Sequence, residues 1–151
     1  MKSQQNELDV KIKLLTDNAE IPKYAHDGDM GMDIKCTSIE YDLKNDCYIC
    51  HTGVAVELPY GYGMLLFPRS SNRKTDLYLP NSVGVVDSNY RGEIMFCYKN
   101  RDIKTSTDFQ YSVGERIGQL IIFPYPKINF NIVDELSNSE RGEGGFGSTG
   151  K

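Results

Sequence analysis

The sequence has no tryptophan, only two histidines and no apolar run long enough to cross a membrane. A membrane helix needs ~20 consecutive apolar residues, and the opening MKSQQNELDVKIKLL also lacks the apolar core of a signal peptide. The 17 Lys and Arg are outnumbered by 21 Asp and Glu, which gives a net charge of −4. Long nucleic acids are bound through many Lys and Arg contacts, although one or a few phosphates remain possible ligands. We expect a cytoplasmic protein, in the host cytoplasm if viral, without nucleic-acid or membrane partners.

Metal-binding patterns are also scarce. Cys47-Tyr-Ile-Cys50 matches C-x-x-C, but a zinc site needs a second such pair or a His-x-x-x-His pattern, and His26 and His51 are isolated. Residues three apart on a strand point to opposite faces, so the two thiols would diverge. We therefore expect no metal held by the protein and four reduced, structural cysteines.

Helical periodicity is absent as well. Apolar residues never keep the spacing of three and four over several turns, so helix should be limited to a turn or two, after Pro68 or before Arg141. Short alternating or β-branched runs are instead separated by Asp, Asn, Gly and Pro. These runs lie at residues 10–14, 32–36, 48–51, 54–58, 63–67, 83–86, 94–96, 109–113, 117–123 and 128–133. Many short strands in 151 residues predict one all-β domain, a sandwich, jelly roll or barrel, whose first strand is half-buried.

Residues 81–93, NSVGVVDSNYRGE, form the first candidate site. A β-branched run and a later apolar run flank three turn-forming residues, which predicts a hairpin. Its tip holds one carboxylate, Asp87, and one large ring, Tyr90, while Gly84 and Gly92 would let a ligand approach the backbone. Such a tip could enclose a small flat molecule. Alternatively, Asp87 and its neighbours only form the turn, because short polar side chains bond their own backbone there.

A second candidate site follows the predicted strand at 63–67. Arg69 offers a planar fork of donors, and Ser70 and Ser71 add hydroxyl groups at the start of a helical turn. Together they could cradle an oxyanion. Alternatively, Arg69 forms a structural ion pair and the serines cap the turn.

The glycine-rich tail, RGEGGFGSTG at 141–150, is the third. It fits the dinucleotide fingerprint and most of a Walker A motif, but both need a preceding strand and a following helix, so we reject both. Arg141, Phe146 and two hydroxyl groups stand among the glycines. The tail is therefore either a disordered linker or a lid that orders over a phosphorylated ligand.

Five segments, in order, resemble the motifs of trimeric dUTP pyrophosphatases (dUTPases), and the resemblance covers nearly the whole chain. They are GMDI at 31–34, PRSS at 68–71, residues 81–93, GERIGQLI at 114–121 and the tail from Arg141. The resemblance implies an all-β, jelly-roll-like β-barrel of the β-clip type over residues 1–136. It also implies a flexible arm at 137–151 that crosses to a neighbour as a lid, and a homotrimer with three active sites at subunit interfaces.

By the same resemblance, the reaction is hydrolysis of dUTP to dUMP and pyrophosphate, which removes dUTP from the nucleotide pool and supplies dUMP for dTMP synthesis. Asp87 would be the general base for water attack on the α-phosphorus, with Asp33 in support. Mg²⁺ would be carried by the phosphates and water. The implied substrate-binding residues are Asn81, Gly84, Val85, Val86 and Tyr90 at the deoxyuridine, Arg69, Ser70, Ser71 and Gln119 at the phosphates, and Arg141, Phe146, Gly147, Ser148 and Thr149 from the arm.

The chain departs from the family pattern at Met30 and Met32, at Ser71 and Asn72, and at Gly118. Two alternatives stay open on the same fold. A dCTP deaminase would need a glutamate base in place of Val85-Val86-Asp87 and would not predict the Phe-bearing tail. A non-catalytic nucleotide-binding regulator is the other, and the intact Asp87 and tail argue against it.

Overall fold

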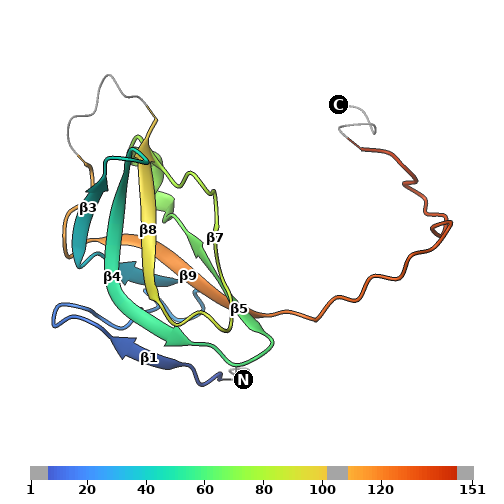
Figure 1. Ribbon diagram of the computed structural model, residues 1–151, viewed down its shortest axis with the longest axis horizontal. Helices are drawn as coiled ribbons and strands as arrows, with labels where there is room; N and C mark the ends of the chain where they lie inside the picture. The colour runs from blue at the N-terminus through green and yellow to red at the C-terminus, as the bar shows by residue number, and fades with distance from the viewer. Residues whose placement is uncertain (1–6, 102–108, 146–151) are drawn as a thin grey trace.

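The computed structural model describes residues 7–101 and 109–145, which form two antiparallel sheets and no α-helix (Figure 1). The strands are β1 (Lys11–Leu14), β2 (Met32–Lys35), β3 (Ser38–Asp42), β4 (Cys47–Glu57), β5 (Tyr62–Phe67), β6 (Leu77–Tyr78), β7 (Gly84–Val86), β8 (Glu93–Asn100) and β9 (Arg116–Pro124), with the 3-10 helix η1 (Ser70–Lys74) after β5. One sheet has the order β1-β4-β8-β6, with β3 also paired to β4, and the other β2-β9-β5-β7. The predicted all-β, jelly-roll-like fold is confirmed.

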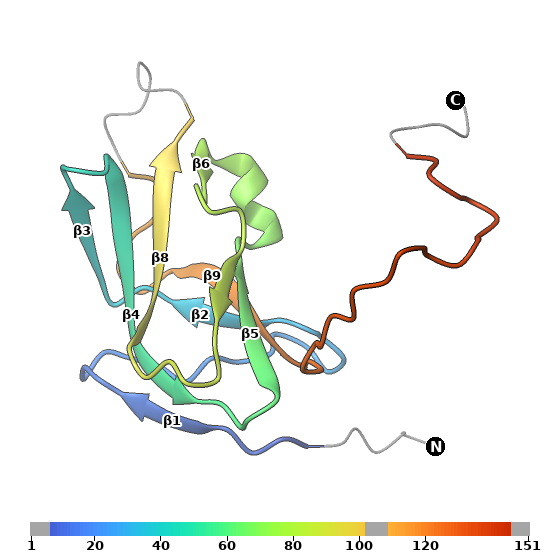
Figure 2. The same cartoon turned by 45° about the vertical axis from the view of Figure 1, so that its right-hand side comes forward.

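The two sheets lie on either side of one core (Figure 2). Along β8, Ile94, Phe96 and Tyr98 are buried, whereas the residues between them face outward. This period of two is what a pleated strand with one covered face requires. The buried Tyr98 hydroxyl donates to the carbonyl of Ile117 in β9 at 2.6 Å, which joins the two sheets. Burial raises the pKa of Tyr98, so the phenol stays a donor.

Two runs that looked like separate strands are one. Residues 47–57 form the single strand β4, and its pairing with β8 shifts register between His51 and Ala55. Gly53 lies at the shift with φ +65°. A glycine of this conformation resembles a turn signal in sequence, but here it makes a β-bulge inside a continuous strand.

Two predicted strands are absent from the described residues. The first is at 109–113, where the rings pack on the sheet without forming a strand. Phe109 stacks on Tyr48 with ring centroids 4.4 Å apart, and the ring centroids of Tyr111 and Tyr98 are 5.4 Å apart. The apolar pattern of this run therefore reflects ring packing and not strand pairing. In the second, at 128–133, the chain is an extended arm after Pro124 that runs away from both sheets (Figure 1). Ile132 is fully exposed there.

The predicted helical turn after Pro68 is confirmed as η1, whereas none precedes Arg141 within the described arm. The predicted strand at 10–14 forms as β1, although all four of its residues are exposed rather than half-buried. The short strands β3 and β6 were not predicted. No helix of the described residues is long and apolar enough to span a membrane.

The predicted hairpin over 83–96 is wrong. Strand β7 pairs with β5 in one sheet, whereas β8 pairs with β4 and β6 in the other. Residues 87–92 therefore carry the chain from sheet to sheet, and a linker of this length does not impose the tight pairing that a two-residue turn would.

All four cysteines are free. Cys50 points into the core, where it lies beside Cys36, and Cys47 lies beside Cys97 on the other face of β4. The divergence predicted for the C-x-x-C pair is confirmed. Burial raises the pKa of Cys97 to about 12, which keeps this thiol protonated at neutral pH.

Candidate active site

An arginine–carboxylate cluster lies where β5 ends and η1 begins. Arg69 contacts Asp33 of β2 through Nε to Oδ1 at 2.7 Å and Nη2 to Oδ2 at 3.2 Å, and Arg116 of β9 adds Nη1 to Oδ2 at 3.0 Å. The Asp33 side chain is only 16% exposed. A two-pronged guanidinium–carboxylate contact fixes the orientation of both groups. Two cations on one carboxylate leave the cluster with a net positive charge.

This geometry decides between the two interpretations of the second motif. Arg69 does form an ion pair, but that pair leaves Nη1 directed at the Ser71 hydroxyl, 3.3 Å away. The residue that caps η1 is Arg69 itself, and no side-chain hydrogen bond caps the turn. The serines are therefore not its caps, and their hydroxyl groups stand beside a fixed guanidinium.

Gln119 completes the same end of the sheet. It pairs in register with Asp33 on β2 and with Phe67 on β5, and its Nε2 donates to the carbonyl of Pro68 at 3.0 Å. A Cβ on Gly31 would lie 2.4 Å from Gln119 Oε1. Glycine at position 31 thus leaves room for the Gln119 amide, which an alanine there would force to move.

Asn72, one of the departures from the family pattern, anchors η1. This buried side chain donates from Nδ2 to the carbonyl of Leu77 at 2.8 Å and accepts from the Tyr111 hydroxyl at 3.0 Å. Thr75 also donates to its carbonyl at 2.8 Å. A buried, fully paired amide stiffens the turn that follows Arg69. Sequence reasoning missed this role, as it missed Arg116.

The other departures are also explained in part. A Cβ on Gly118 would lie 2.2 Å from the ring of Phe96, so the large ring and the missing side chain compensate each other. Met32 lies on β2 beside Asp33, and Met30 is 73% exposed. Nothing in the structure explains why methionine stands at position 30.

The loop 87–92 presents Asp87 and Tyr90 at the surface. Asp87 is exposed, and its carboxylate makes no hydrogen bond or ion pair with another described residue. The loop is braced from within, because Arg91 Nη1 donates to the carbonyls of Ser88 and Tyr90 at 2.7 and 2.9 Å. The turn also places Tyr90 N 3.1 Å from the Asp87 carbonyl. A carboxylate held on a braced loop with both oxygens available is suited to act as a base.

The two glycines predicted to admit a ligand, Gly84 and Gly92, also lie close to side chains of their own chain. A Cβ on Gly92 would lie 2.3 Å from the Tyr90 hydroxyl, and one on Gly84 would lie 3.0 Å from Leu66 Cβ. Gly84, the first residue of β7, is buried against Leu66 of β5, while Asn81 and Val85 are exposed. Val86, the last residue of β7, is buried.

The two groups of predicted site residues are not brought together within one chain. In the pairing of β5 with β7, Leu66 faces Gly84 and Met64 faces Val86. Arg69 therefore lies beyond one end of this strand pair and Asp87 beyond the other. At a rise of about 3.3 Å per residue, the separation along the sheet is roughly 20 Å. A small substrate could reach both groups only if a second copy supplied one of them.

The arm holds the remaining predicted residues. Arg141 lies in an exposed turn, where its Nε donates to the Gly144 carbonyl at 2.7 Å. The arm that carries this turn runs away from both sheets (Figure 1). Phe146, Gly147, Ser148 and Thr149 lie outside the described residues.

Comparison with known proteins gives consistent results. The family model described as dUTPase matches residues 17–150. The Deoxyuridine 5'-triphosphate nucleotidohydrolase of Clostridium tetani (strain Massachusetts / E88) is 40% identical over 146 residues, which cover 96% of this chain and 99% of the relative.

Two solved structures are similar to the chain. The dUTPase of Staphylococcus bacteriophage 80alpha, solved with dUPNHPP, is 32% identical with a TM-score of 0.77, over 95% of this chain and 99% of that one. A mutant dUTPase from phage phi11 of S. aureus, described as showing the coordination of a structural Mg(II) ion, is 27% identical with a TM-score of 0.67, over 85% and 98%.

Proposed function

Because the chain belongs to the dUTPase family, and is therefore an enzyme that hydrolyses dUTP, we propose that Asp87 activates the attacking water. The observation that supports this role most strongly is the exposed carboxylate on its braced loop, which is bonded to no other residue that the structure describes. The water oxygen forms a bond to the α-phosphorus, its proton passes to Asp87, and the bond to the bridging oxygen breaks to release dUMP and pyrophosphate. The reaction removes dUTP from the nucleotide pool and supplies dUMP for dTMP synthesis.

The positively charged cluster would hold the phosphates. Phosphoryl transfer depends mainly on positioning and charge neutralisation, which suits Arg69 fixed on Asp33. Ser70, Ser71 and Gln119 supply further polar groups at the same strand ends. Asp33 is committed to two guanidinium groups, so its role is to orient Arg69.

Magnesium would enter on the substrate. Among the described residues, no three His, Cys, Asp or Glu side chains are grouped to hold a metal ion, and Asp33 is already paired with arginines. Mg²⁺ prefers to keep several waters and to bind phosphate oxygens. When bound there, it neutralises charge on the phosphates.

Recognition of the nucleoside falls to residues 81–90. Asn81 and the backbone of Val85 and Val86 would pair with the edge of uracil, beside the closely packed Gly84, and the ring of Tyr90 would pack against the deoxyribose. Cytosine exchanges a donor for an acceptor on that edge, and the resulting unpaired polar groups disfavour it. The 2′-hydroxyl of a ribonucleotide would meet the Tyr90 ring.

Substrate preference tests the function directly. Pyrophosphate release should be fastest with dUTP, with kcat/KM for dCTP lower by about 10⁴-fold, because a site built for hydrogen bonding rejects the wrong edge strongly. UTP and dTTP should also be poor substrates. Ammonia release from dCTP would instead identify a deaminase, and nucleotide binding without turnover would identify a regulator.

The roughly 20 Å between Arg69 and Asp87 supports a homotrimer with active sites shared between copies. The arm would contribute a lid: Arg141, Ser148 and Thr149 would bind the γ-phosphate end, Phe146 would stack on the base, and Gly147 would let the backbone approach. A glycine-rich lid of residues 137–151 orders only when ligand contacts offset the loss of entropy. The four free thiols support a reducing, cytoplasmic location.

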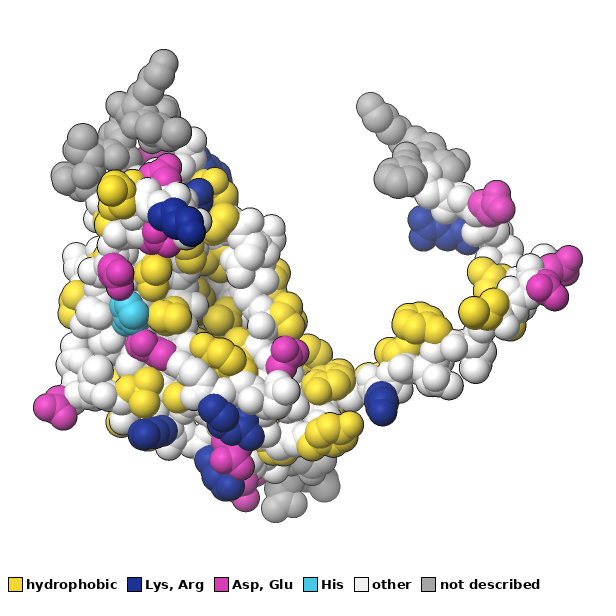
Figure 3. Space-filling model, in the orientation of Figure 1, with side chains coloured by type: hydrophobic (Ala, Val, Ile, Leu, Met, Phe, Trp, Pro, Cys, Tyr) yellow, Lys and Arg dark blue, Asp and Glu magenta, His cyan; other side chains and the backbone are white. Residues whose placement is uncertain are grey.

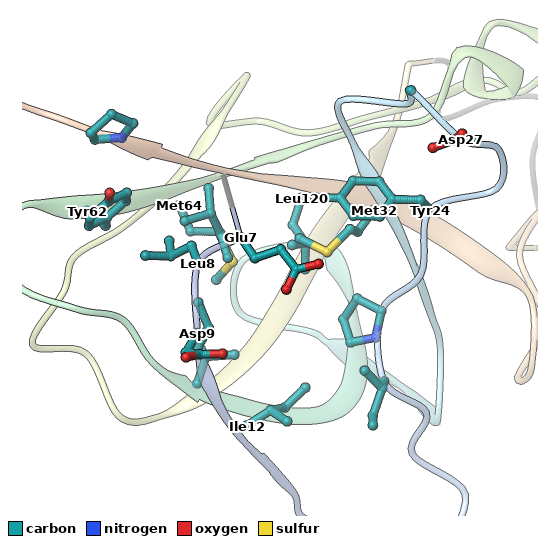
Figure 4. A pocket seen from close by; sticks show the side chains of 17 residues that line it. Glu7, Leu8, Asp9, Ile12, Tyr24, Asp27, Met32, Tyr62, Met64 and Leu120 are labelled. Atoms are coloured by element: carbon teal, nitrogen blue, oxygen red, sulfur yellow. The ribbon is translucent and has the colours of Figure 1, made fainter. Parts of the chain in front are cut away.

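A large hollow lies apart from all these residues and would receive a neighbour's arm. It has a volume of about 1150 Å³, and Figure 4 shows Leu8 from the N-terminal segment facing Met64 and Leu120 across it. Glu7, Asp9 and Asp27 also line it. The hollow is open in a single chain, and these three carboxylates make it unsuited to the negatively charged phosphates of a nucleoside triphosphate.

The arm has the matching pattern. Ile128, Phe130 and Ile132 alternate with asparagines, so they lie on one side of an extended chain, and they are 61%, 89% and 100% exposed. Figure 3 shows hydrophobic side chains along the arm, away from the body. The barrel unit of residues 1–136 would then be completed only between copies.

Ile132→Asp should therefore separate the trimer at micromolar concentration, because the new carboxylate would lose its hydration and lie in a hollow that Glu7, Asp9 and Asp27 already line. Light scattering measures the outcome. Asn131→Asp is the matched control, since it adds the same charge on the opposite side of the extended arm, and it should stay trimeric. An Ile132→Asp protein that remains a trimer would contradict the proposal that the arm binds in a neighbour's hollow.

A further inference from the structure

One charged pair outside the proposed site leads directly into the Asp87 loop. Glu93, the first residue of β8, places Oε2 2.9 Å from His51 Nδ1 and accepts the Gly53 backbone N–H on Oε1 at 2.7 Å. Its side chain is 22% exposed and that of His51 is 25% exposed. One carboxylate thus bridges β8 to β4 at the point where the bulge interrupts the ladder.

The backbone of Glu93 is tied to the loop in turn. Its carbonyl accepts the Tyr90 hydroxyl at 3.0 Å, and the Tyr90 ring fills the space over Gly92. The Tyr90 N–H donates to the Asp87 carbonyl. A continuous chain of contacts therefore runs from His51 through Glu93 and Tyr90 to Asp87.

We propose that His51 and Glu93 are positioning residues that fix the Asp87–Tyr90 loop and make its placement depend on the protonation of His51. The inference rests on the proposed function, because it assigns the pair to the loop that carries the base. His51 and Glu93 touch no substrate. They act by anchoring residue 93, and with it Tyr90, to the bulge of β4.

The electrostatic setting supports this dependence. The hydrogen bond that His51 donates to Glu93 raises the pKa of His51, and Glu40 of β3, whose carboxylate lies 3.6 Å from Nε2, raises it further. The Cys36 thiol on the core side is the other titratable group that senses this histidine. On the sheet face visible in Figure 3, acidic side chains flank a histidine. With Glu93 ionised, the ion pair is complete at about pH 6, and it is lost as pH rises through the raised pKa of His51.

The expected result is a change in the pH profile. Glu93→Gln keeps the acceptor for Gly53 but removes the charge, and it should lower kcat/KM for dUTP by about tenfold at acidic to neutral pH, since small displacements of catalytic groups are costly. In the parent enzyme, kcat/KM should fall as His51 loses its proton. In Glu93→Gln and in His51→Gln, kcat/KM should not show this fall with rising pH. If Glu93→Gln does not fold, His51→Gln alone tests the prediction.

Two control variants separate positioning from stability. Glu40→Gln alters a second, 67%-exposed partner of His51 that has no contact with the loop, so the fall in kcat/KM should remain. Thr52→Val removes a buried hydrogen bond to the Ile94 carbonyl at the same strand pair, so it should lower Tm while keeping the fall. A pH profile unchanged by Glu93→Gln would overturn the proposal.

Amide hydrogen exchange provides a readout independent of turnover. Exchange at residues 88–92 should be faster in Glu93→Gln and His51→Gln than in Thr52→Val. Equal exchange in all three would overturn the anchoring even if activity changed. If the parent protein fails to hydrolyse dUTP, the proposed function is wrong, and the exchange experiment still decides whether the pair anchors the loop.

Discussion

Asp87→Asn should bind the substrate analogue dUpNHpp almost as tightly as the parent protein while its turnover falls by about 10²–10⁴-fold, the range that general base catalysis contributes. The amide has nearly the shape of the carboxylate but cannot accept the proton of the attacking water. Because the Asp87 carboxylate has no partner among the described residues, the substitution breaks no contact that they make with it. The free energy of unfolding should therefore change by no more than about 0.5 kcal/mol.

Three measurements check this prediction: calorimetric titration with dUpNHpp, single-turnover hydrolysis of dUTP, and thermal melting. Asn89→Ala is the control, because Asn89 is exposed in the same loop and has no proposed role. It should keep turnover near the parent rate. Activity of Asp87→Asn within tenfold of the parent would remove Asp87 from the role of base, and the loss of analogue binding would make it a binding residue instead.

The parts of the structure that the sequence predicts well are those decided by local pattern. The turn after Pro68 forms because a short helical turn needs only neighbouring residues. The β2 strand and its carboxylate, Asp33, follow from alternation over a few positions. The same pattern cannot reveal which distant groups meet, so the second cation on Asp33, Arg116, stayed hidden.

The errors share one physical cause. An alternating pattern of apolar residues indicates which side chains are to be buried, but it does not indicate which strand or subunit covers them. Residues 128–133 alternate as a strand does, yet no strand in the described part of the chain pairs with them, and their apolar side chains stay exposed. The runs on either side of residues 87–92 both form strands, but the two strands pair with partners in different sheets. His51 and Glu93 are 42 positions apart, so no local signal marks them as a pair.

The separation of Arg69 from Asp87 leads to the prediction with the clearest outcome. Arg69→Gln should be inactive, because the phosphates lose a fixed cation whose removal costs about 10²-fold or more. Its amide can still donate to Asp33, and Arg116 remains on that carboxylate, so the fold should persist. If each active site takes Asp87 from one copy and Arg69 from another, the two inactive variants complement each other. Asp87→Asn supplies an intact Arg69, and Arg69→Gln supplies an intact Asp87.

Unfolding Asp87→Asn and Arg69→Gln together and refolding them as a mixture should therefore restore activity. In an equal mixture that assembles at random, about one quarter of the sites would combine an intact Asp87 with an intact Arg69. The control is a mixture of the two variants that are folded separately and combined without denaturant, so that subunits do not exchange. This mixture should remain inactive. Native mass spectrometry would verify that hybrid trimers have formed. Hybrid trimers without activity would place both residues of a site in one chain, since a site confined to a single copy always carries one of the two substitutions.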